Sequence, residues 1–256
     1  MFGVLRKLAG RLRGNELRTD PRDVFVVSYP RSGNTWVRFL LANLLRARDG
    51  KPVDFYTLPL YVPDLHIEEH RDIVRRMEPP RLLKTHDLPA GYMRRVIYLL
   101  RDGRDVAVSH YVYLKSLGRF DGSFMEYLES PRGPRRWARH VSEWLDARDD
   151  RALLVVRYED LKSETAGQLR RMAQFAGLPA DTEDIERAVE RSNFESMRKL
   201  QDTNGRPYSN SGQLQQVRKG TAGQWRDWFD DAHIEVFNRC AGDVLRKLGY
   251  EDNAGS

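Results

Sequence analysis

The stretch VFVVSYPRSGNTWVRFLLANLL, residues 24–45, decides the fold. Its first four residues are apolar and mostly β-branched, which predicts a buried strand over residues 24–27. From Trp36 onward, apolar residues recur at helical spacing. Residues 28–35 contain Pro30 and Gly33 and predict a tight turn. We therefore expect a strand, a loop and a helix.

This loop is a candidate anion-binding site. The first N–H groups of a helix lack intrahelical partners and lie at the positive end of its dipole. Arg31 adds a fixed positive charge, and Ser32 and Thr35 add hydroxyl donors. The loop thus predicts a phosphate or sulfate site, with an ordinary βα turn as the alternative. The Walker A pattern is absent, which disfavours an ATP-hydrolysing enzyme with a hydroxyl-held Mg²⁺.

Composition narrows the classes of protein to consider. The 256 residues suffice for one large α/β domain, and a hydrophobic content of 40% is compatible with a packed core. The 43 basic and 37 acidic residues are mixed, so the net charge of +6 fits an anionic ligand at least as well as nucleic acid. Cys240 is the only cysteine, so nothing argues for an oxidising compartment and we expect a cytoplasmic protein.

Residues 1–19 are expected to form a basic amphipathic segment ahead of a domain at residues 20–250. Arg6 and Lys7 interrupt the apolar core that a secretory signal would need. The apolar residues of the segment can share one helical face, with basic residues around it. Such a helix would lie on an anionic membrane surface, peripheral to the inner face of the membrane, or it would pack on its own domain.

Apolar runs predict further strands over residues 81–86, 95–100 and 152–156. Helical patterns over residues 134–150, 161–176 and 230–248 alternate with them. Residues 115–134 and 200–224 are polar, glycine-containing stretches that predict loops, the second a flap able to order over an anionic ligand. The alternation predicts an α/β fold, a single P-loop-like domain whose central, largely parallel sheet is flanked by helices on both faces.

Functional residues are expected at the carboxyl ends of these strands. Lys84 and His86 are two residues apart, so on an extended segment they point to the same side. A neighbouring lysine favours the neutral imidazole, which can accept a proton, although a plain surface turn is the alternative. Arg101 and Arg104 follow the strand over residues 95–100 and mark a second candidate anion site.

His66, Glu69 and His70 match the H-x-x-E-H zinc signature. On a helix the two histidines would share one face, and Glu69 could act as a base. The sequence offers no identifiable third ligand, and the flanks are polar and charged. We therefore expect a solvated helix face and no metal.

Taken together, these stretches resemble the sulfotransferases that use 3′-phosphoadenosine 5′-phosphosulfate (PAPS), in the branch that includes the cytosolic enzymes. The arginine-rich composition suggests a bacterial member. The resemblance covers residues 24 to 230, nearly the whole domain. Its motifs, in chain order, are YPRSGNTW (29–36), LLKTH (82–86), RDGRDVAVSHY (101–111), WARHVSEW (137–144), VVRYEDL (155–161), SNFESM (192–197) and RKGTAGQW (218–225).

The resemblance implies transfer of a sulfuryl group from PAPS to the hydroxyl or amine of a small-molecule, carbohydrate or lipid acceptor. The other product is 3′,5′-adenosine bisphosphate (PAP), and no metal is implied. His86 would be the general base, while Lys84 and Arg31 would stabilise charge near the sulfuryl group. The cofactor-binding residues implied are Arg31, Ser32, Gly33, Asn34, Thr35, Trp36, Arg101, Ser109, Tyr158, Phe194, Arg218, Lys219 and Gly220.

Within this set, Arg101, Ser109, Arg218 and Lys219 would hold the 3′-phosphate. The aromatic residues Trp36, Tyr158 and Phe194 would surround the adenine. The aromatic residues Phe55, Tyr56, Tyr61, Phe120, Phe124 and Tyr127 are candidates for an acceptor pocket and equally for the core.

The sequence also departs from the family pattern. Arg31 stands where the family usually has lysine, and a guanidinium does not deprotonate in proteins, so its role is limited to charge and hydrogen bonding. The short dimer motif of the family is not recognisable after residue 225, which leaves the oligomeric state open. The alternative functions are a nucleotide kinase-like P-loop enzyme and a nucleic-acid or membrane-surface binder driven by positive charge.

Overall fold

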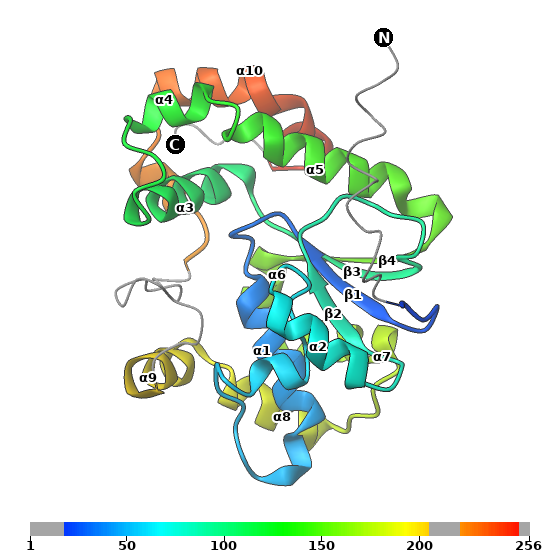
Figure 1. Cartoon of the computed structure of the whole chain (residues 1–256). Coiled ribbons are helices and arrows are strands. Elements are labelled where there is room, and N and C mark those ends of the chain that lie inside the picture. Colours follow the sequence, from blue (N-terminus) through cyan, green and yellow to red (C-terminus); the bar gives the residue numbers. More distant parts are fainter. Residues whose placement is uncertain (1–17, 205–220, 251–256) are drawn as a thin grey trace.

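A four-stranded parallel sheet lies at the centre of the computed structural model, which describes residues 18–204 and 221–250 (Figure 1). Its strands are β1 (Val24–Ser28), β2 (Leu82–Thr85), β3 (Arg95–Leu100) and β4 (Ala152–Arg157). They lie in the order β2-β1-β3-β4, and every neighbouring pair is parallel. The predicted strands agree with these bounds to within one residue.

Helices cover both faces of the sheet, as predicted (Figure 1). Successive strand residues point to opposite faces, so Phe25 and Val27 join one core cluster while Val24 and Val26 join the other. The first cluster contains residues of α3 (Gly103–Ser116), α4 (Phe124–Glu129), α5 (Pro134–Asp146) and α10 (Asp231–Lys247). The second contains residues of α1 (Asn34–Leu45), α7 (Thr165–Ala176) and α8 (Thr182–Arg191).

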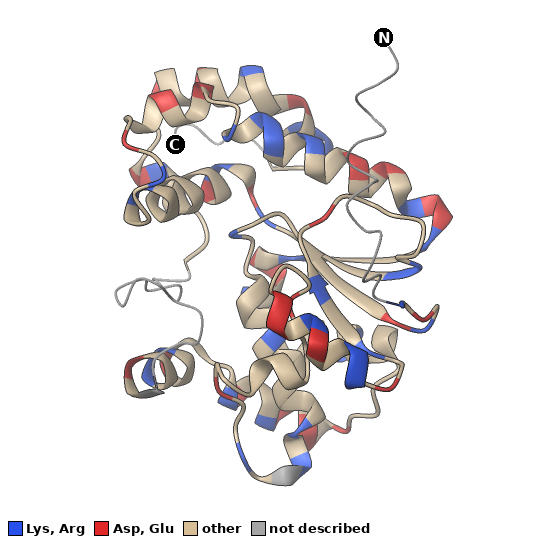
Figure 2. Ribbon diagram, viewed as in Figure 1, with Lys and Arg blue, Asp and Glu red and all other residues tan. Residues whose placement is uncertain are grey.

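The remaining helices lie along the edges of this sandwich. They are α2 (Glu68–Arg76), α6 (Tyr158–Ser163) and α9 (Phe194–Asn204), with short 3₁₀ turns at Ala47–Asp49, Leu58–Leu60, Ala147–Asp150 and Gln224–Asp227. Basic and acidic positions are mixed over the ribbon, as the composition predicts (Figure 2). Among the helices that the structure describes, none is both long and apolar enough to cross a membrane.

The predicted loop over residues 115–134 is wrong in part, because it contains α4. Ser123 and Glu126 form a capping box, in which each side chain binds the backbone N–H of the other residue. This S-x-x-E spacing is visible in the sequence, but the surrounding glycines obscured it. The predicted helix over residues 161–176 is in fact two helices, α6 and α7, which meet at Glu164.

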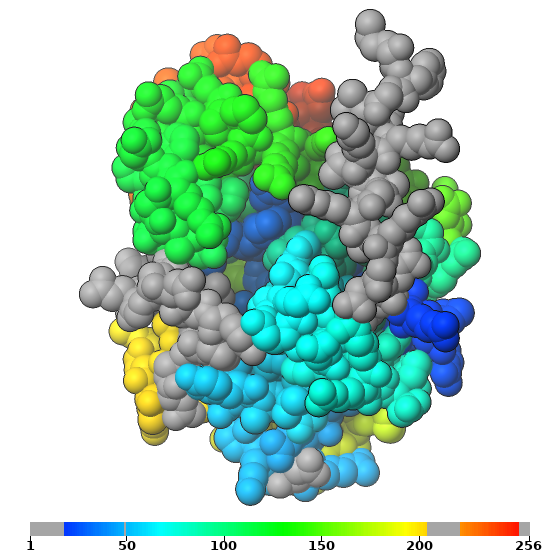
Figure 3. Space-filling view, in the orientation of Figure 1, coloured from blue at the N-terminus to red at the C-terminus, as the bar shows by residue number. Residues whose placement is uncertain are grey.

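The order of the strands creates a crevice at one edge of the sheet. β1 has β2 on one side and β3 on the other. The chain therefore moves to one side of β1 to form β2, and then crosses to the other side of β1 to form β3. Ligands of open α/β sheets bind where the strand order reverses in this way. Figure 3 shows a hollow there, between the green residues of α3 to α5 and the cyan residues around α2, with the dark-blue loop after β1 at its floor.

Candidate active site

The loop after β1 is shaped for close approach by a ligand. Arg31 and Gly33 both have positive φ angles, of 72° and 97°. Positive φ is rare for arginine and is found where surrounding structure holds it, often at binding sites. Trp36 and Val37 donate their backbone N–H groups to Gly33 O, so α1 begins directly after the loop. The Ser32 hydroxyl is buried and has no hydrogen-bond partner among the described residues.

Arg31 joins this loop to α3. Its Nε donates to Ser109 Oγ over 3.2 Å, and its guanidinium lies 4.8 Å from the centre of the Tyr113 ring. The structure therefore brings together two residues that the sequence assigned to different parts of one site. The planar guanidinium of Arg31 extends towards α3, and a lysine at this position could not make the same combination of hydrogen bond and ring contact.

Arg101 and two aromatic rings form the next part of the site. Arg101 follows β3 and donates from Nη1 to Arg31 O over 3.3 Å. Its guanidinium stacks 4.4 Å from the centre of the Tyr158 ring, and Tyr158 meets Trp36 edge-on at 5.9 Å between ring centres. Arg101 Nε is buried without a hydrogen-bond partner among the described residues. An anionic ligand with an aromatic base fits this set of donors and rings.

Asp105 links this region to a distant part of the chain. Its carboxylate accepts from Gly223 N over 2.8 Å, from Trp225 N over 2.9 Å and from Arg101 Nη2 over 3.4 Å. Burial raises the pKa of Asp105, while the Arg101 charge and the two N–H groups oppose that rise. Residues 221–225 are thus held against the start of α3. Arg218, Lys219, Gly220 and most of the predicted flap lie outside the described residues.

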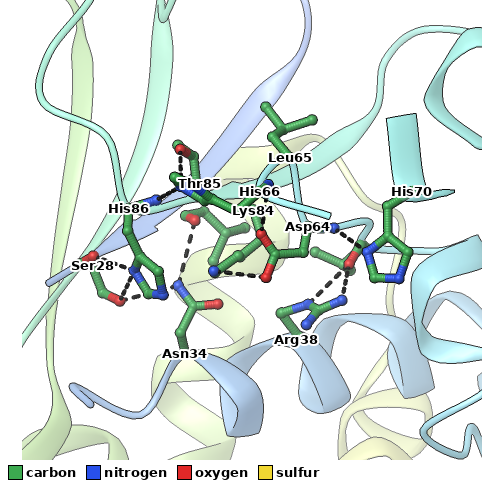
Figure 4. A network of polar contacts seen from close by, with 12 residues as sticks. Ser28, Asn34, Arg38, Asp64, Leu65, His66, His70, Lys84, Thr85 and His86 are labelled. Carbon is green, nitrogen blue, oxygen red and sulfur yellow. Dashed lines mark hydrogen bonds and ion pairs between the residues drawn. The ribbon is translucent and has the colours of Figure 1, made fainter. Parts of the chain in front are cut away.

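His86 has a defined tautomer (Figure 4). Its Nδ1 lies 2.6 Å from Ser28 O, and a carbonyl oxygen can only accept, so Nδ1 carries the proton and Nε2 has the lone pair. Burial, and after it the Lys84 charge, holds the pKa of His86 well below its usual range. The predicted bias towards neutral imidazole is confirmed, with burial as the larger cause.

Lys84 has a carboxylate partner that the sequence did not indicate. Its Nζ lies 2.8 Å from Asp64 Oδ2, and the two side chains are only 7% and 13% exposed. Burial lowers the pKa of Lys84 to about 8, and the ion pair with Asp64 limits the shift. At neutral pH the ammonium is therefore still charged, but one of its three donors is committed to Asp64.

Helix α5 holds the backbone at His86 and at the residue that follows it. His140 Nε2 lies 3.2 Å from His86 O, and His140 Nδ1 lies 2.9 Å from the Tyr98 hydroxyl. Trp144 Nε1 donates to Asp87 O over 3.0 Å. Burial lowers the pKa of His140 to about 4, which keeps it neutral, as a ring that donates from Nε2 and accepts at Nδ1 requires.

A comparison with known families decides the class of enzyme. The model of the sulfotransferase domain family matches residues 21–249. The chain belongs to this family. It is a PAPS-dependent sulfotransferase, which transfers a sulfuryl group from PAPS to a hydroxyl acceptor. The kinase-like alternative is therefore wrong, and so is a binding protein without enzymatic activity.

Relatives and solved structures agree with this assignment. Sulfotransferase 1B1 of Mus musculus is 28% identical over 258 residues, covering 88% of this chain and 83% of its own. Sulfotransferase 2A1 of Homo sapiens is 28% identical over 245 residues, covering 90% and 86%. Retinol dehydratase in complex with retinol and PAP has a similar fold, with a TM-score of 0.70, 23% identity and coverage of 94% and 85%. Mouse sulfotransferase SULT7A1 complexed with PAP has a TM-score of 0.66, 21% identity and coverage of 91% and 88%.

The two histidines of the H-x-x-E-H match each accept a hydrogen bond from a backbone N–H group. His66 precedes α2, and its Nε2 accepts from His86 N over 3.0 Å. His70 lies within α2, is buried, and accepts from Asp64 N at Nδ1 over 2.9 Å. Over residues 18–204 and 221–250 no three metal-binding side chains come together. The predicted solvated helix face is wrong for His70, which is buried within α2, whereas Glu69 is exposed and His66 lies before the helix with a side chain that is 44% exposed.

Two other groups of predicted residues lie apart from the site. Phe194, at the first turn of α9, is 38% exposed, and the described structure shows no ring contact between it and Trp36 or Tyr158. The candidate acceptor aromatics belong mostly to the core: Phe124 and Tyr127 are buried, and Phe55 packs 4.8 Å from Phe39. Tyr56 is 53% exposed.

Proposed function

We propose that His86 is the general base that takes the proton of the acceptor hydroxyl during sulfuryl transfer. This proposal rests on the hydrogen bond from His86 Nδ1 to Ser28 O, because that bond leaves the Nε2 lone pair available to the hydroxyl of the acceptor substrate. The lowered pKa keeps the ring neutral before the reaction.

The charge that develops on the leaving phosphate is met by three groups of this chain. They are Arg31, Lys84 and the N–H groups at the start of α1. Sulfuryl transfer, like phosphoryl transfer, moves charge in line from nucleophile to leaving group, so positioning and neutralisation dominate catalysis. Lys84 contributes through the donors that Asp64 leaves available.

The cofactor-binding set fits a nucleotide with a 3′-phosphate. Arg101 and Ser109 would hold that phosphate, together with Arg218, Lys219 and Gly220. Ser32, Gly33, Asn34 and Thr35 would hold the phosphosulfate. Trp36 and Tyr158, and after reorientation Phe194, would hold the adenine. Support comes from two buried polar atoms, Ser32 Oγ and Arg101 Nε, which have no hydrogen-bond partner among the described residues, because such atoms are rare unless a ligand satisfies them.

The acceptor is proposed to be a small molecule with a hydroxyl group. Retinol dehydratase, of similar fold, has been crystallised with retinol and with androsterone. An acceptor screen with ³⁵S-labelled PAPS as the donor tests this proposal. The compounds to screen are phenols, sterols, sugars, lipid headgroups and amines. Label transfer to a hydroxyl compound supports the proposal. Transfer to amines alone would contradict it.

The domain is proposed to span residues 20–250, with residues 1–19 as a separate segment that contacts an anionic membrane surface. Sedimentation with vesicles containing anionic lipid, for the full chain and for a chain without residues 1–19, tests the second part. Equal sedimentation of the two chains would contradict a membrane role for the segment.

Gly33→Ala is expected to weaken both the fold and nucleotide binding. An added Cβ would lie 2.6 Å from Cδ2 of Tyr158, and Gly33 has a φ of 97°. Displacing the Tyr158 ring should weaken PAP binding at least about tenfold and cost about 1–3 kcal/mol of unfolding free energy. Calorimetry with PAP and thermal melting measure the two effects. Gly118→Ala is the control, because its φ is also positive, at 64°, but an added Cβ meets nothing within 4 Å. Equal losses in both variants would show that only backbone conformation matters.

Asp105→Asn is expected to weaken PAP binding about tenfold or more. The amide keeps one acceptor oxygen, and its NH₂ group faces one of the N–H groups that Asp105 now binds. Residues 221–225 should then be released from α3. Titration calorimetry with PAP provides the measurement, and Asp243→Asn is the control, because Asp243 is 98% exposed. Unchanged PAP affinity in a folded Asp105→Asn chain would contradict a role for this link in cofactor binding.

A further inference from the structure

His66 lies beside His86 because of strand register. Residues 63–65 extend the sheet beyond β2, with Asp64 paired in parallel with Lys84. Lys84 N donates to Pro63 O over 2.9 Å, and Leu65 N donates to Lys84 O over 2.9 Å. Two residues further along both segments, the register places His66 next to His86. Their ring centres are 5.8 Å apart, with an angle of 31° between the planes (Figure 4).

The contact between the two histidines depends on an uncharged His66. The backbone N–H of His86 donates to His66 Nε2 over 3.0 Å, so that nitrogen must have a free lone pair. Nε2 also lies 3.2 Å from Thr85 Oγ1, whose hydroxyl donates to Asp87 Oδ2. A proton on Nε2 would face the His86 N–H donor, and the ring would then gain by turning towards Thr85 Oγ1 and Asp87 Oδ1, the latter 3.6 Å away.

His66 differs from the other groups that hold the catalytic segment. Ser28 O, His140 and Trp144 are buried, whereas the His66 side chain is 44% exposed. Water can therefore deliver a proton to His66 while the other contacts of the segment stay unchanged.

We propose that His66 is a positioning residue of the sulfotransferase, whose uncharged Nε2 holds the backbone of His86 and whose protonation releases it. The proposal rests on the proposed role of His86 as base. It predicts that acid slows the reaction through His66, since burial and Lys84 already keep His86 itself unprotonated.

The charged groups around His66 come from three segments. Asp64 accepts the His66 backbone N–H over 3.0 Å and shares its carboxylate with Lys84. Asp87 and His86 face the ring from the segment after β2. From α2, Arg71 donates to Leu65 O and pairs with Glu68. Asp87 is the nearest carboxylate, so it is the group that would stabilise a charged ring.

Two variants of His66 separate its role as a hydrogen-bond acceptor from the effect of its charge. His66→Leu removes the acceptor atom. Glutamine can place an oxygen near the position of Nε2, so His66→Gln keeps an acceptor that cannot be charged. His233→Gln is the control, because His233 lies at the start of α10, outside the site.

Kinetics of the full chain with PAPS and a hydroxyl acceptor from the screen give the first readout. In mildly alkaline buffer we expect His66→Leu to lower kcat about 10- to 100-fold, with KM for PAPS within about twofold, because a misplaced base costs turnover and not cofactor binding. His66→Gln should restore kcat to within about threefold of the parent. In mildly acidic buffer the parent and His233→Gln should slow, whereas His66→Gln should keep its rate. A His66→Leu chain with parental kcat, or a His66→Gln chain that slows in acid like the parent, would overturn the proposal.

A second readout needs no acceptor. In a ¹⁵N-histidine-labelled chain saturated with PAP, the amide resonance of His86 should move on acidification in the parent and in His233→Gln, and stay in place in His66→Gln. If the His86 amide resonance moved equally in all three chains, the proposed hydrogen bond between His86 N and His66 Nε2 would be refuted. Full activity of a His86→Ala chain would instead refute the proposed base and leave the His66 contact to be judged by this resonance alone.

Discussion

Replacing His86 with alanine is expected to lower turnover about 10²- to 10⁴-fold, the usual contribution of a general base. The imidazole is fixed by Ser28 O, so the alanine chain loses the proposed acceptor of the substrate proton and little else. The lowered pKa of His86 means that the basic form predominates at neutral pH and below. The ratio between parent and variant should therefore stay constant through the neutral range. Initial rates with labelled PAPS measure it.

The cofactor provides the internal control for this experiment. PAP affinity of His86→Ala should stay within about twofold of the parent, because no cofactor contact is assigned to His86. His233→Ala, which removes a histidine at the start of α10, should behave as the parent. A fall in PAP affinity as large as the fall in kcat would show that His86 shapes the nucleotide site and is not the base.

Arg101→Ala is expected to abolish the preference of the enzyme for PAP over 5′-AMP. Charged hydrogen bonds contribute about 1.5–3 kcal/mol each, so two or three of them to the 3′-phosphate predict a preference of about 10²- to 10⁴-fold. The buried Nε of Arg101 has no hydrogen-bond partner among the described residues, so it is available for the proposed contact with the 3′-phosphate. Calorimetry of both nucleotides at one salt concentration, for parent and variant, gives the ratio.

Loss of Arg101 also removes its contacts with Arg31 O and Thr221 O, so thermal melting must accompany the binding data. Arg139→Ala is the matched control, because Arg139 is an exposed arginine that pairs with Glu143 on α5. If the parent binds both nucleotides equally, the assignment of the 3′-phosphate site fails. If the Arg101→Ala chain keeps the preference of the parent, the 3′-phosphate is held elsewhere.

The sheet and the loop before α1 could be predicted from the sequence because each depends on a local signal. Apolar runs mark β1 to β4, and the turn residues before Trp36 mark the loop that leads into α1. The neutral state of His86 could also be predicted, since its neighbour Lys84 is two residues away. These are interactions within a few residues, which periodicity and spacing record directly.

Asp64, His66 and His140 could not be assigned in the same way. Asp64 binds Lys84 only because residues 63–65 extend the sheet in one particular register. His140 reaches His86 O from 54 positions away. Neither contact leaves a periodic pattern, and the H-x-x-E-H match suggested a metal because its two histidines were read as members of one helix. The position of His66 is instead set by the register in which residues 63–65 pair with β2.

The two hydrogen bonds from the backbone of residues 223 and 225 to Asp105 have a consequence for folding during synthesis. Synthesis proceeds from the N-terminus, and early parts of a chain begin to fold before later parts exist. The β1 loop, Arg101 and Asp105 can therefore assemble while residues 221–225 are still inside the ribosome. Until those residues emerge, the Asp105 carboxylate lacks two of its donors and Arg101 lacks Thr221 O. Cofactor capture should thus appear late in translation, and PAP binding would report a finished chain.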